Sequence, residues 1–331
     1  MGAHYSGRSD LDVGEIGPNY LWYGSCTGPT CGDSRVKPDI VAPGRSLLTA
    51  RAKPSSYGEC DPSQKISPGQ ELNGNSYRYG TSFAAPVVSG AAALVRQYFM
   101  DGYYPSGAAN SAKSYNPSAP LVKAILLNGA QPLLGKQLAN GSVVNMNSLN
   151  KGYDAQQGFG RISLSDSLPL SNYPSTKKLK AVVFDRIPIS AGQVHQTVVS
   201  IDTYNCNINN DFSVTLAWND PPSAAGCVDC MLSDLNLIVQ RQNDGAVWRG
   251  NDIWNQGIAD TSNNVERVRI INVSSSHTFV VKVVAADLVY AQQKYSLVMT
   301  GCPQYESSSN NFDACPCPAG QFCSGCDNAL S

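Results

Sequence analysis

The sequence predicts an α/β domain, then an all-β sandwich of the jelly-roll kind, then a short cysteine-rich tail. Up to about residue 172, helical patterns alternate with loops and one short strand signal. From about residue 177 to residue 300, apolar residues recur at every second position, as in half-buried strands. Beyond residue 301 this periodicity is lost and cysteines are frequent. We therefore predict domains at residues 1–172, 173–301 and 302–331.

The strand signal in the first domain lies in "KPDIVAPG". Its residues Asp39–Ala42 lean apolar, and Pro43 and Gly44 are expected to close the strand with a turn. Further on, "SAPLVKAILLNGAQP" predicts a helix over Pro120–Asn128. We expect this helix to stop at Gly129, because glycine readily adopts the left-handed conformation that ends helices.

The longest helix is predicted to begin close to Ser82. Pro86 follows four residues later, and proline is tolerated in the first helical turn because its missing N–H is not needed there. The following residues, 87–95, are small and apolar on nearly every side, so we expect the helix to be packed within a core.

The second domain is predicted from about eight alternating runs separated by turn residues. In "FSVTLAW", for example, Val214, Leu216 and Trp218 should share one buried face, and "DLNLIVQ", "TFVVKVV" and "YSLVM" show the same alternation. No helical pattern separates these runs, which favours a sandwich or jelly roll over a parallel sheet.

Charge and cysteine content restrict the partners and the compartment. The chain has 24 Lys+Arg and 25 Asp+Glu in 331 residues and no basic block, so we expect neither nucleic acid nor anionic lipid as a partner. No apolar run reaches the roughly 18 residues of a membrane helix. Eleven cysteines indicate an extracellular or luminal protein. Gly2 and Ser6 match a myristoylation pattern that would contradict this, and no signal peptide is recognisable.

Ser82 has two interpretations on chemical grounds. At the start of a buried helix, free backbone N–H groups and the positive end of the helix dipole could stabilise an oxyanion, which would suit a nucleophile. Gly80 would let a substrate backbone approach closely. Alternatively, Thr81 or Ser82 simply caps the helix.

A family resemblance favours the nucleophile. "GTSFAAP", with Gly80, Thr81, Ser82 and Pro86, resembles the serine motif of the subtilisin-like proteases (subtilases, peptidase family S8), and "GPTCGDSRVKPDIVAPG" is similar to the segment preceding it. "PSAPLVKAILLNGA", "QGFGRISLSDSL", "LSDLNLIV", "GND" and "NNVERVRI" resemble the branch that carries a C-terminal β-sandwich, which includes subtilisin KP-43. The resemblance spans roughly residues 24–300 and implies a doubly wound sheet, incomplete here, before the sandwich.

The resemblance implies a serine endopeptidase acting on proteins or peptides. Ser82 would attack the peptide carbonyl, assisted by a histidine and an aspartate. In the family those partners precede the serine in D-[ST]-G and H-G-[ST] motifs, which residues 1–81 lack. His4 lacks that context, and His195 and His277 are expected at cross-strand surface positions. We therefore expect the partners upstream of this chain, or else a degenerate, catalytically inactive binding or adhesion protein with the same shell.

Two further groups of residues are candidate sites. The resemblance implies no cofactor for the chemistry but allows structural Ca²⁺, for which the candidate oxygen ligands are Asp234, Asn236, Asn251, Asp252, Asn264 and Glu266. Such residues are also common turn formers, so a structural role stays open. The pairs Cys227/Cys230 and Cys323/Cys326 lie too far apart in sequence for a compact zinc module.

The tail resembles the start of a cysteine-rich extracellular module. With almost no apolar residues, it needs disulfides to order itself, and the candidate cysteines are Cys302, Cys315, Cys317, Cys323 and Cys326. Tyr77, Arg78 and Tyr79, just before the serine motif, are expected to border the leaving-group side of the cleft.

Overall fold

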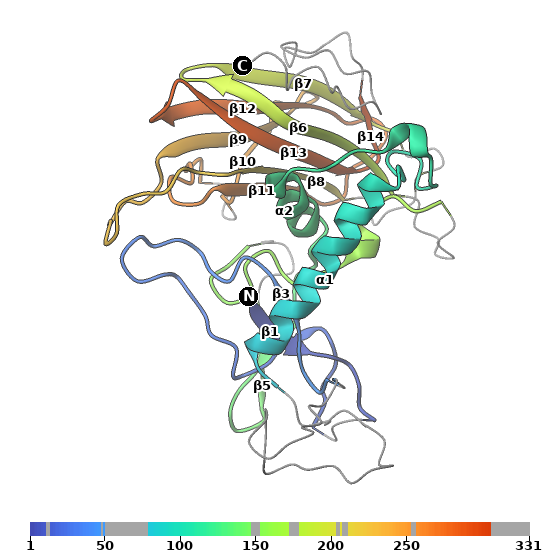
Figure 1. Ribbon diagram of the computed structural model, residues 1–331, viewed down its shortest axis with the longest axis vertical. Coiled ribbons are helices and arrows are strands. Elements are labelled where there is room, and N and C mark those ends of the chain that lie inside the picture. Colours follow the sequence, from blue (N-terminus) through green and yellow to red (C-terminus); the bar gives the residue numbers. More distant parts are fainter. Residues whose placement is uncertain are drawn as a thin grey trace, which may run out of the picture.

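The structure is a computed structural model that describes residues 1–10, 14–47, 49, 79–146, 153–171, 179–202, 206, 211–252 and 256–305. Tyr77, Arg78, the predicted boundary near residue 172 and the tail cysteines from Cys315 onward lie outside the described residues. Figure 1 shows a large sandwich above a smaller sheet, with helices between and beside them. Within the described ranges, neither helix combines the length and apolarity needed to cross a membrane.

The N-terminal part contains a five-stranded mixed sheet in the order β3-β1-β2-β4-β5. Strand β1 pairs in parallel with β3, and β2 with β4, whereas β1/β2 and β4/β5 are antiparallel. The strands are β1 (Gly2–Tyr5), β2 (Tyr20–Leu21), β3 (Val41–Arg45), β4 (Gly135–Gln137) and β5 (Val143–Asn145). The two parallel pairs fit an α/β domain in outline, but a doubly wound arrangement is not confirmed by this sheet.

The strand predicted over Asp39–Ala42 exists, but it is displaced toward the C-terminus. Strand β3 includes Pro43 and Gly44, which therefore do not close it as a turn. Proline is compatible with this strand because its ring removes only one backbone donor from the ladder. A side chain at Gly44 would approach the Ala3 side chain to 2.5 Å, so glycine permits the close pairing of β3 with β1.

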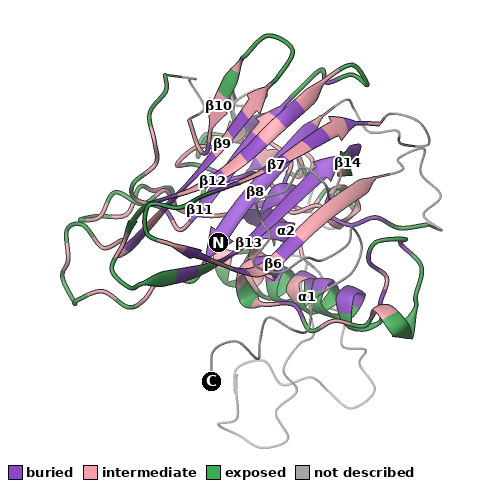
Figure 2. Ribbon diagram, turned by 90° about the horizontal axis from the view of Figure 1, so that it is seen from above, coloured by how far each residue is buried: buried purple, intermediate pink, exposed green. Residues whose placement is uncertain are grey.

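Helix α1 (Thr81–Met100) begins where the proline argument places it, but it is not buried all round. Its buried residues repeat at helical spacing along one side: Ala84, Val88, Ala91, Val95, Tyr98 and Phe99. On the other side, Val87, Leu94 and Met100 are 36%, 54% and 44% exposed. The prediction of a helix packed within a core is therefore wrong for the described part of the chain. Figure 2 shows both buried and exposed turns along α1.

Helix α2 (Ala119–Asn128) has the predicted bounds within a residue. Its N-cap is Ser118, whose hydroxyl accepts a hydrogen bond from the Leu121 amide at 3.1 Å. The helix stops at Gly129 as predicted, but the predicted left-handed conformation is wrong, because this residue has right-handed helical angles (φ −87°). Glycine is required there for a different reason, since a Cβ would lie 2.2 Å from the Ser167 hydroxyl.

The C-terminal part is a sandwich of two antiparallel sheets. One has the order β10-β9-β12-β7-β14 and the other β11-β8-β13-β6. Their strands are β6 (Lys180–Ser190), β7 (Val194–Ile201), β8 (Phe212–Trp218), β9 (Ser233–Arg241), β10 (Val247–Arg249), β11 (Val265–Ile270), β12 (Thr278–Leu288), β13 (Gln292–Gly301) and β14 (Pro303–Tyr305). The predicted sandwich is thus observed, whereas its assignment as a jelly roll stays a prediction.

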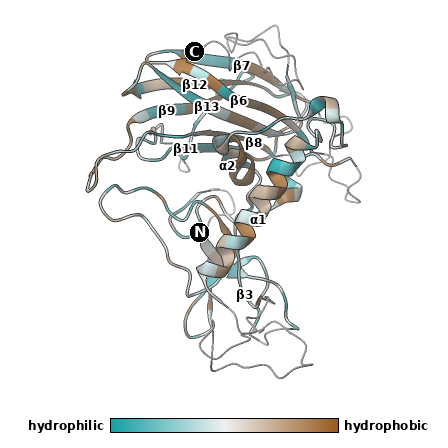
Figure 3. Cartoon of the chain, in the orientation of Figure 1, coloured by the Kyte–Doolittle hydropathy of each residue, from teal (hydrophilic) through white to brown (hydrophobic). Residues whose placement is uncertain are grey.

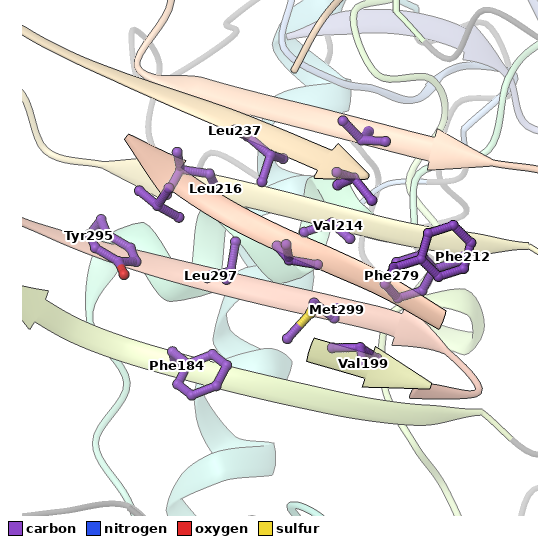
Figure 4. Close-up of a cluster of buried hydrophobic side chains, with 14 of the residues drawn as sticks. Phe184, Val199, Phe212, Val214, Leu216, Leu237, Phe279, Tyr295, Leu297 and Met299 are labelled. Atoms are coloured by element: carbon purple, nitrogen blue, oxygen red, sulfur yellow. The ribbon is translucent and has the colours of Figure 1, made fainter. Parts of the chain in front are cut away.

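The sandwich core lies between the two sheets (Figure 4). As predicted, Val214, Leu216 and Trp218 face this core together and are at most 1% exposed. The rings of Phe212 and Phe279 stack across it with centroids 5.0 Å apart. Each such fully buried apolar side chain contributes about 1.5–3 kcal/mol relative to exposure.

Strand β8 is buried on both faces, contrary to the expectation of half-buried strands. The cause is α2, which packs against β8 and β13 on the outer face of their sheet. There, Ala217 and Val298 join the same apolar cluster as Leu121 and Ile125 of α2. The sandwich and the helical layer therefore share a continuous core.

Polar groups reinforce this junction. The buried Asn128 side chain donates to the Thr300 hydroxyl at 2.6 Å and accepts from the Thr215 hydroxyl at 2.9 Å. The guanidinium of Arg267 on β11 donates to the carbonyl oxygens of Leu127 (2.7 Å) and Ala130 (3.2 Å). A cation bound to the last carbonyls of a helix is also favoured by the helix dipole.

Arg267 is almost completely enclosed. Arg267 is 5% exposed. Its guanidinium donates to the Phe159 carbonyl at 3.1 Å and lies 4.9 Å from the centroid of the Phe159 ring. Burial, with a smaller contribution from nearby Arg269, lowers the pKa of Arg267 to about 9. The side chain therefore stays charged at neutral pH because the surrounding carbonyls replace water.

We expect Arg267→Met to lower the free energy of unfolding by about 3 kcal/mol, because it leaves buried carbonyls without their charged donor. Urea unfolding followed by fluorescence measures this loss. Arg8→Met is the matched control, since Arg8 and its partner Asp10 are largely exposed and should contribute little. Equal stability of the two variants would contradict a structural role for Arg267.

Candidate functional site

The candidate site is the N-terminal end of α1. Gly80 is its N-cap, with φ 144° and ψ 156°, a conformation that residues with a side chain rarely adopt. Its amide donates to the Gly44 carbonyl of β3 at 2.7 Å. A Cβ at Gly80 would find no atom closer than 3.7 Å, so the glycine is needed here for its backbone angles.

Ser82 is the second residue of the helix, and it is exposed. The alternative that Thr81 or Ser82 caps the helix is wrong, because Gly80 occupies the cap and no side chain bonds there. The amides of Phe83 and Ala84 both donate to the Gly80 carbonyl, at 3.0 and 3.4 Å. Among the described residues, no acceptor is recorded for the amides of Thr81 and Ser82 or for the Ser82 hydroxyl.

Pro86 modifies the same turn. The sequence argument placed Pro86 in the first turn of the helix. It is instead the sixth residue of α1 and so lies beyond that turn. Without an N–H, Pro86 cannot donate to the Ser82 carbonyl, which interrupts the regular hydrogen-bond ladder directly below the serine. In the turn that carries Ser82, the first backbone amides therefore have no acceptor among the described residues, and the Ser82 carbonyl lacks the hydrogen bond from residue 86.

Aromatic and cationic side chains gather beside this turn. Tyr79 is 55% exposed, and its ring centroid lies 5.5 Å from that of Trp22. The Arg45 guanidinium lies 5.6 Å from the ring centroids of both Tyr79 and Tyr5, within cation–π range. Of these residues, only Tyr79 was expected near the serine. Tyr5 lies on β1, Arg45 lies on β3, and Trp22 directly follows β2. Only the pairing of these strands brings the three side chains together.

The histidines do not supply a base to Ser82 in the described residues. His4 is 3% exposed in β1, and its Nδ1 contacts the Tyr5 carbonyl. Burial lowers the pKa of His4 to about 4, despite the hydrogen bond to Tyr5. His195 is buried beside the Tyr295 hydroxyl (2.9 Å), so its predicted surface position is wrong, and His277 accepts from the Ser274 amide at 3.2 Å.

The acidic residue Asp39 is also engaged in ion pairs. Asp39 precedes β3, and its carboxylate lies 2.7 Å from the Lys37 ammonium and 3.7 Å from that of Lys123. This arrangement serves charge pairing and contains no histidine. The described residues therefore present a positioned serine without an aspartate–histidine pair.

The described residues contain no cluster of three or more His, Cys, Asp or Glu suited to a metal, and two of the calcium candidates are engaged elsewhere. Asp252 accepts from the loop amides of Gln256, Gly257 and Ile258, at 3.0, 2.7 and 3.2 Å. The Asn264 side chain bonds Lys123 and the Trp218 carbonyl. Asp252 therefore stabilises its own loop, and Asn264 links its segment to Lys123 and Trp218.

The remaining candidates lie near Asp260, which sequence reasoning missed. The Asn251 amide donates to Asp260 at 2.6 Å, and Asn236 donates to Asp234 at 3.3 Å. Glu266 is 1% exposed; Oε2 accepts from the Leu237 amide at 2.6 Å, while Oε1 is buried and has no hydrogen-bond partner among the described residues. Burial raises the pKa of Glu266, and nearby Asp260 and Asp234 add to the rise.

The cysteine predictions have mixed outcomes. Cys302 does form a disulfide, but with Cys206, which lies outside the tail. Cys227 and Cys230 form a second disulfide, which removes them as zinc ligands. Cys26 and Cys31 are exposed free thiols in the described part of the chain.

Comparisons with known proteins point to one family. The sequence profile of the Subtilase family matches residues 11–160. Two similar proteins from Dictyostelium discoideum, tagA and tagD, are each named serine protease/ABC transporter B family protein, with 32% identity over 286 residues and 29% over 316 residues. The alignments cover 83% and 84% of this chain but 15% and 17% of those relatives, so the chain spans about a sixth of their length.

One solved structure, the Yersinia pseudotuberculosis-derived mitogen (YPM), aligns with 43% of this chain and 99% of its own. The TM-score is 0.25 at 11% identity, a likeness too weak to support an argument about fold or function. The resemblance to subtilisin KP-43 is not addressed by these comparisons and stays a prediction.

We expect His4 to make stability depend on pH. Its folded pKa of about 4 lies below the ordinary value of 6.5, so the unfolded chain binds more protons between these values. The free energy of unfolding should therefore fall as pH is lowered from 6.5 to 4, by about 3 kcal/mol from this residue. His4→Gln should remove that portion of the fall in urea unfolding at pH 7.5 and 4.5. An unchanged pH dependence would contradict the assignment.

Proposed function

Because residues 11–160 of this chain belong to the subtilase family, we propose that the protein is a serine-type endopeptidase with Ser82 as its nucleophile. The observation that carries the proposal is the exposed hydroxyl of Ser82 at the second position of α1, beside backbone donors without described acceptors. Its substrates would be proteins or peptides.

The proposed chemistry follows from this position. The Ser82 oxygen attacks the peptide carbonyl, and the carbonyl oxygen becomes negatively charged in the tetrahedral intermediate. A helix N-terminus stabilises such a charge through its free amides and its dipole. The Gly80–Gly44 hydrogen bond holds the turn against β3, so the serine and these donors keep a fixed relation to each other.

A base is the missing part, and we propose that residues preceding Met1 in a longer polypeptide supply the histidine and the aspartate. The length of the relatives supports this, since each is several times as long as the present chain. The exposed apolar residues Val87, Leu94 and Met100 support it as well, because a further part of the polypeptide could cover them (Figure 3).

We place the protein in an extracellular or luminal compartment in this proposal. The Cys206–Cys302 and Cys227–Cys230 disulfides are of the kind that such a compartment maintains. The alternative, a catalytically inactive subtilase-like binding or adhesion protein, would keep the same fold and disulfides, so only a chemical test of Ser82 separates the two.

We further propose that calcium has a structural role near Glu266 rather than a role in the chemistry. Oε1 of Glu266, which has no partner among the described residues, and the carboxylate of Asp260 are hard oxygen donors of the kind that Ca²⁺ prefers. The charge of Asp234 also acts on Glu266, and the Asn251 side chain bonds Asp260. A cation there would favour the ionised form of a carboxyl group whose pKa burial otherwise raises.

Ser82 should be the residue that a fluorophosphonate probe modifies in a longer recombinant chain carrying the upstream histidine and aspartate. Ser82→Ala should abolish labelling and lower peptidase turnover by about 10⁶-fold, the loss known for subtilisin, itself a member of this family. Residues 1–331 alone should stay unlabelled, because a serine hydroxyl is a weak nucleophile without a base.

Ser89→Ala is the matched control for this experiment. Ser89 lies on the same helix, is also exposed, and bonds only the Ala85 carbonyl at 3.1 Å. Labelling and turnover should match the unmodified protein. An unlabelled longer chain with both partners present would support the binding protein, and strong Ser82-dependent labelling of residues 1–331 would show that another residue acts as the base.

Adding Ca²⁺ to protein treated with a chelator should raise its thermal unfolding midpoint, with a gain of about 2.7 kcal/mol at 100 times the dissociation constant. Glu266→Gln should abolish this gain and leave the calcium-free protein as stable, because the neutral amide can still accept from Leu237. Asp252→Asn is the control that should keep the gain. Calorimetry that detects the same gain in all three proteins would refute the proposed role of Glu266.

A further inference from the structure

The two disulfides of the described chain differ in exposure and in sequence separation, both of which affect their reactivity. Cys206 and Cys302 are 7% and 2% exposed, belong to the sandwich core, and are separated by 96 residues. Cys227 and Cys230 are only three positions apart, half-buried, on the loop between β8 and β9. Between them Val228 is 77% exposed.

The base of this loop is secured without its disulfide. The Asp220 carboxylate accepts from the amides of Leu232 and Ser233, both at 2.8 Å, and the Trp218 indole donates to the Ser233 carbonyl at 2.9 Å. The disulfide therefore closes only the tip of the loop. Closing so short a loop also removes little entropy from the unfolded chain, compared with a closure over 96 residues.

We propose that Cys227–Cys230 is a thiol-exchange site that small thiols of the glutathione class modify reversibly, whereas Cys206–Cys302 is a permanent structural bond. Exposure lets a thiolate reach the first pair, and reduction there costs the fold little, so both kinetics and equilibrium favour exchange. This inference does not depend on the proposed peptidase activity.

The contacts of the two sulfur atoms indicate which sulfur is attacked and which one leaves. The Ser223 hydroxyl lies 3.4 Å from Cys227 Sγ and can donate a hydrogen bond to a thiolate there. Cys230 Sγ lies 3.1 Å from the Cys227 carbonyl oxygen, which would repel a negative charge. Cys227 is therefore the better leaving group, and Cys230 is the sulfur that is attacked.

The exchange step needs only the incoming thiolate and the disulfide. The incoming thiolate forms a bond to Cys230 Sγ, the Cys227–Cys230 bond breaks, and its electron pair leaves on Cys227 as a thiolate. The product is a mixed disulfide on Cys230. A second small thiolate can then attack the external sulfur, which releases Cys230 as a thiolate and yields the oxidised dimer of the small thiol.

Asp229 should select among thiols by charge. It lies between the two cysteines and is exposed, so its carboxylate repels a glutathione molecule, which carries a net negative charge. A cationic thiol such as cysteamine should react faster at equal thiolate concentration. Asp229→Asn should reduce this preference by a few-fold, since an exposed charge is largely screened.

The test uses the whole chain. All free thiols, including Cys26 and Cys31, are first blocked with N-ethylmaleimide. The protein is then equilibrated in graded reduced and oxidised glutathione, and new thiols are alkylated and located by peptide mass spectrometry. We expect Cys227 and Cys230 to become thiols, and Cys230 to carry glutathione, at a reduced glutathione concentration about tenfold or more below that which opens Cys206–Cys302.

Two variants complete the test. Ser223→Ala should slow the exchange several-fold, with unchanged reduction of Cys206–Cys302. The double variant Cys227→Ser, Cys230→Ser should keep the urea midpoint of the unmodified protein, because the loop base remains closed. The proposal fails if both disulfides open at the same glutathione concentration, if glutathione is found on Cys227 rather than on Cys230, or if the double variant loses stability.

Discussion

Helix α2 lies between α1 and the outer face of the four-stranded sheet, and this contact links the two halves of the molecule. A strand face that is normally solvated is buried here, so Ala217 and Val298 are small or apolar where a surface strand would carry polar residues. The junction also encloses the polar end of α2, and its carbonyls must find donors inside the protein. Arg267 supplies them, and Asn128 pairs with hydroxyl groups of the sheet. Arg267 and Asn128 are both needed, because the buried carbonyls of α2 and the buried hydroxyl groups of the sheet would otherwise lose hydrogen-bond partners.

The same contact determines how the serine turn is held. The far end of α1 is anchored by Tyr98, whose hydroxyl donates to the Pro169 carbonyl at 2.8 Å, and by the apolar cluster that α1 shares with α2. At the other end, the Gly80–Gly44 hydrogen bond attaches the helix to β3. Ser82 thus lies at the start of a helix that is held at both ends, and the residue is still exposed. This combination of a rigid backbone and an exposed side chain is what a nucleophile requires.

The sequence predicts those features that depend on local pattern. The alternation in Val214, Leu216 and Trp218 located a sandwich strand, because this signal lies within the element it describes. The start of α1 close to Ser82 is confirmed, although Pro86 lies beyond the first turn that the argument assumed. Prediction from the sequence fails for features that depend on contacts between segments distant along the chain. Gly129 was expected to be left-handed, but its requirement arises from Ser167, and the second buried face of β8 arises from α2. Trp22, Arg45 and Tyr5 carry no local signal for their position beside Tyr79, and Asp260 none for its proximity to Glu266.

The site itself shows the limit of local geometry in catalysis. The backbone of residues 80–82 provides free amides, a helix dipole and an exposed hydroxyl, and all three follow from a short motif. These groups stabilise the negative charge that forms after attack, but they do not remove the proton that prevents attack. A base must come from a segment distant in sequence, and the buried His4, with its pKa near 4, is too weakly basic and too enclosed to replace it. The proposed role of Ser82 therefore requires a long-range contact. The exposed apolar side chains Val87, Leu94 and Met100 would also need one to become buried, and a single covering segment could satisfy both requirements.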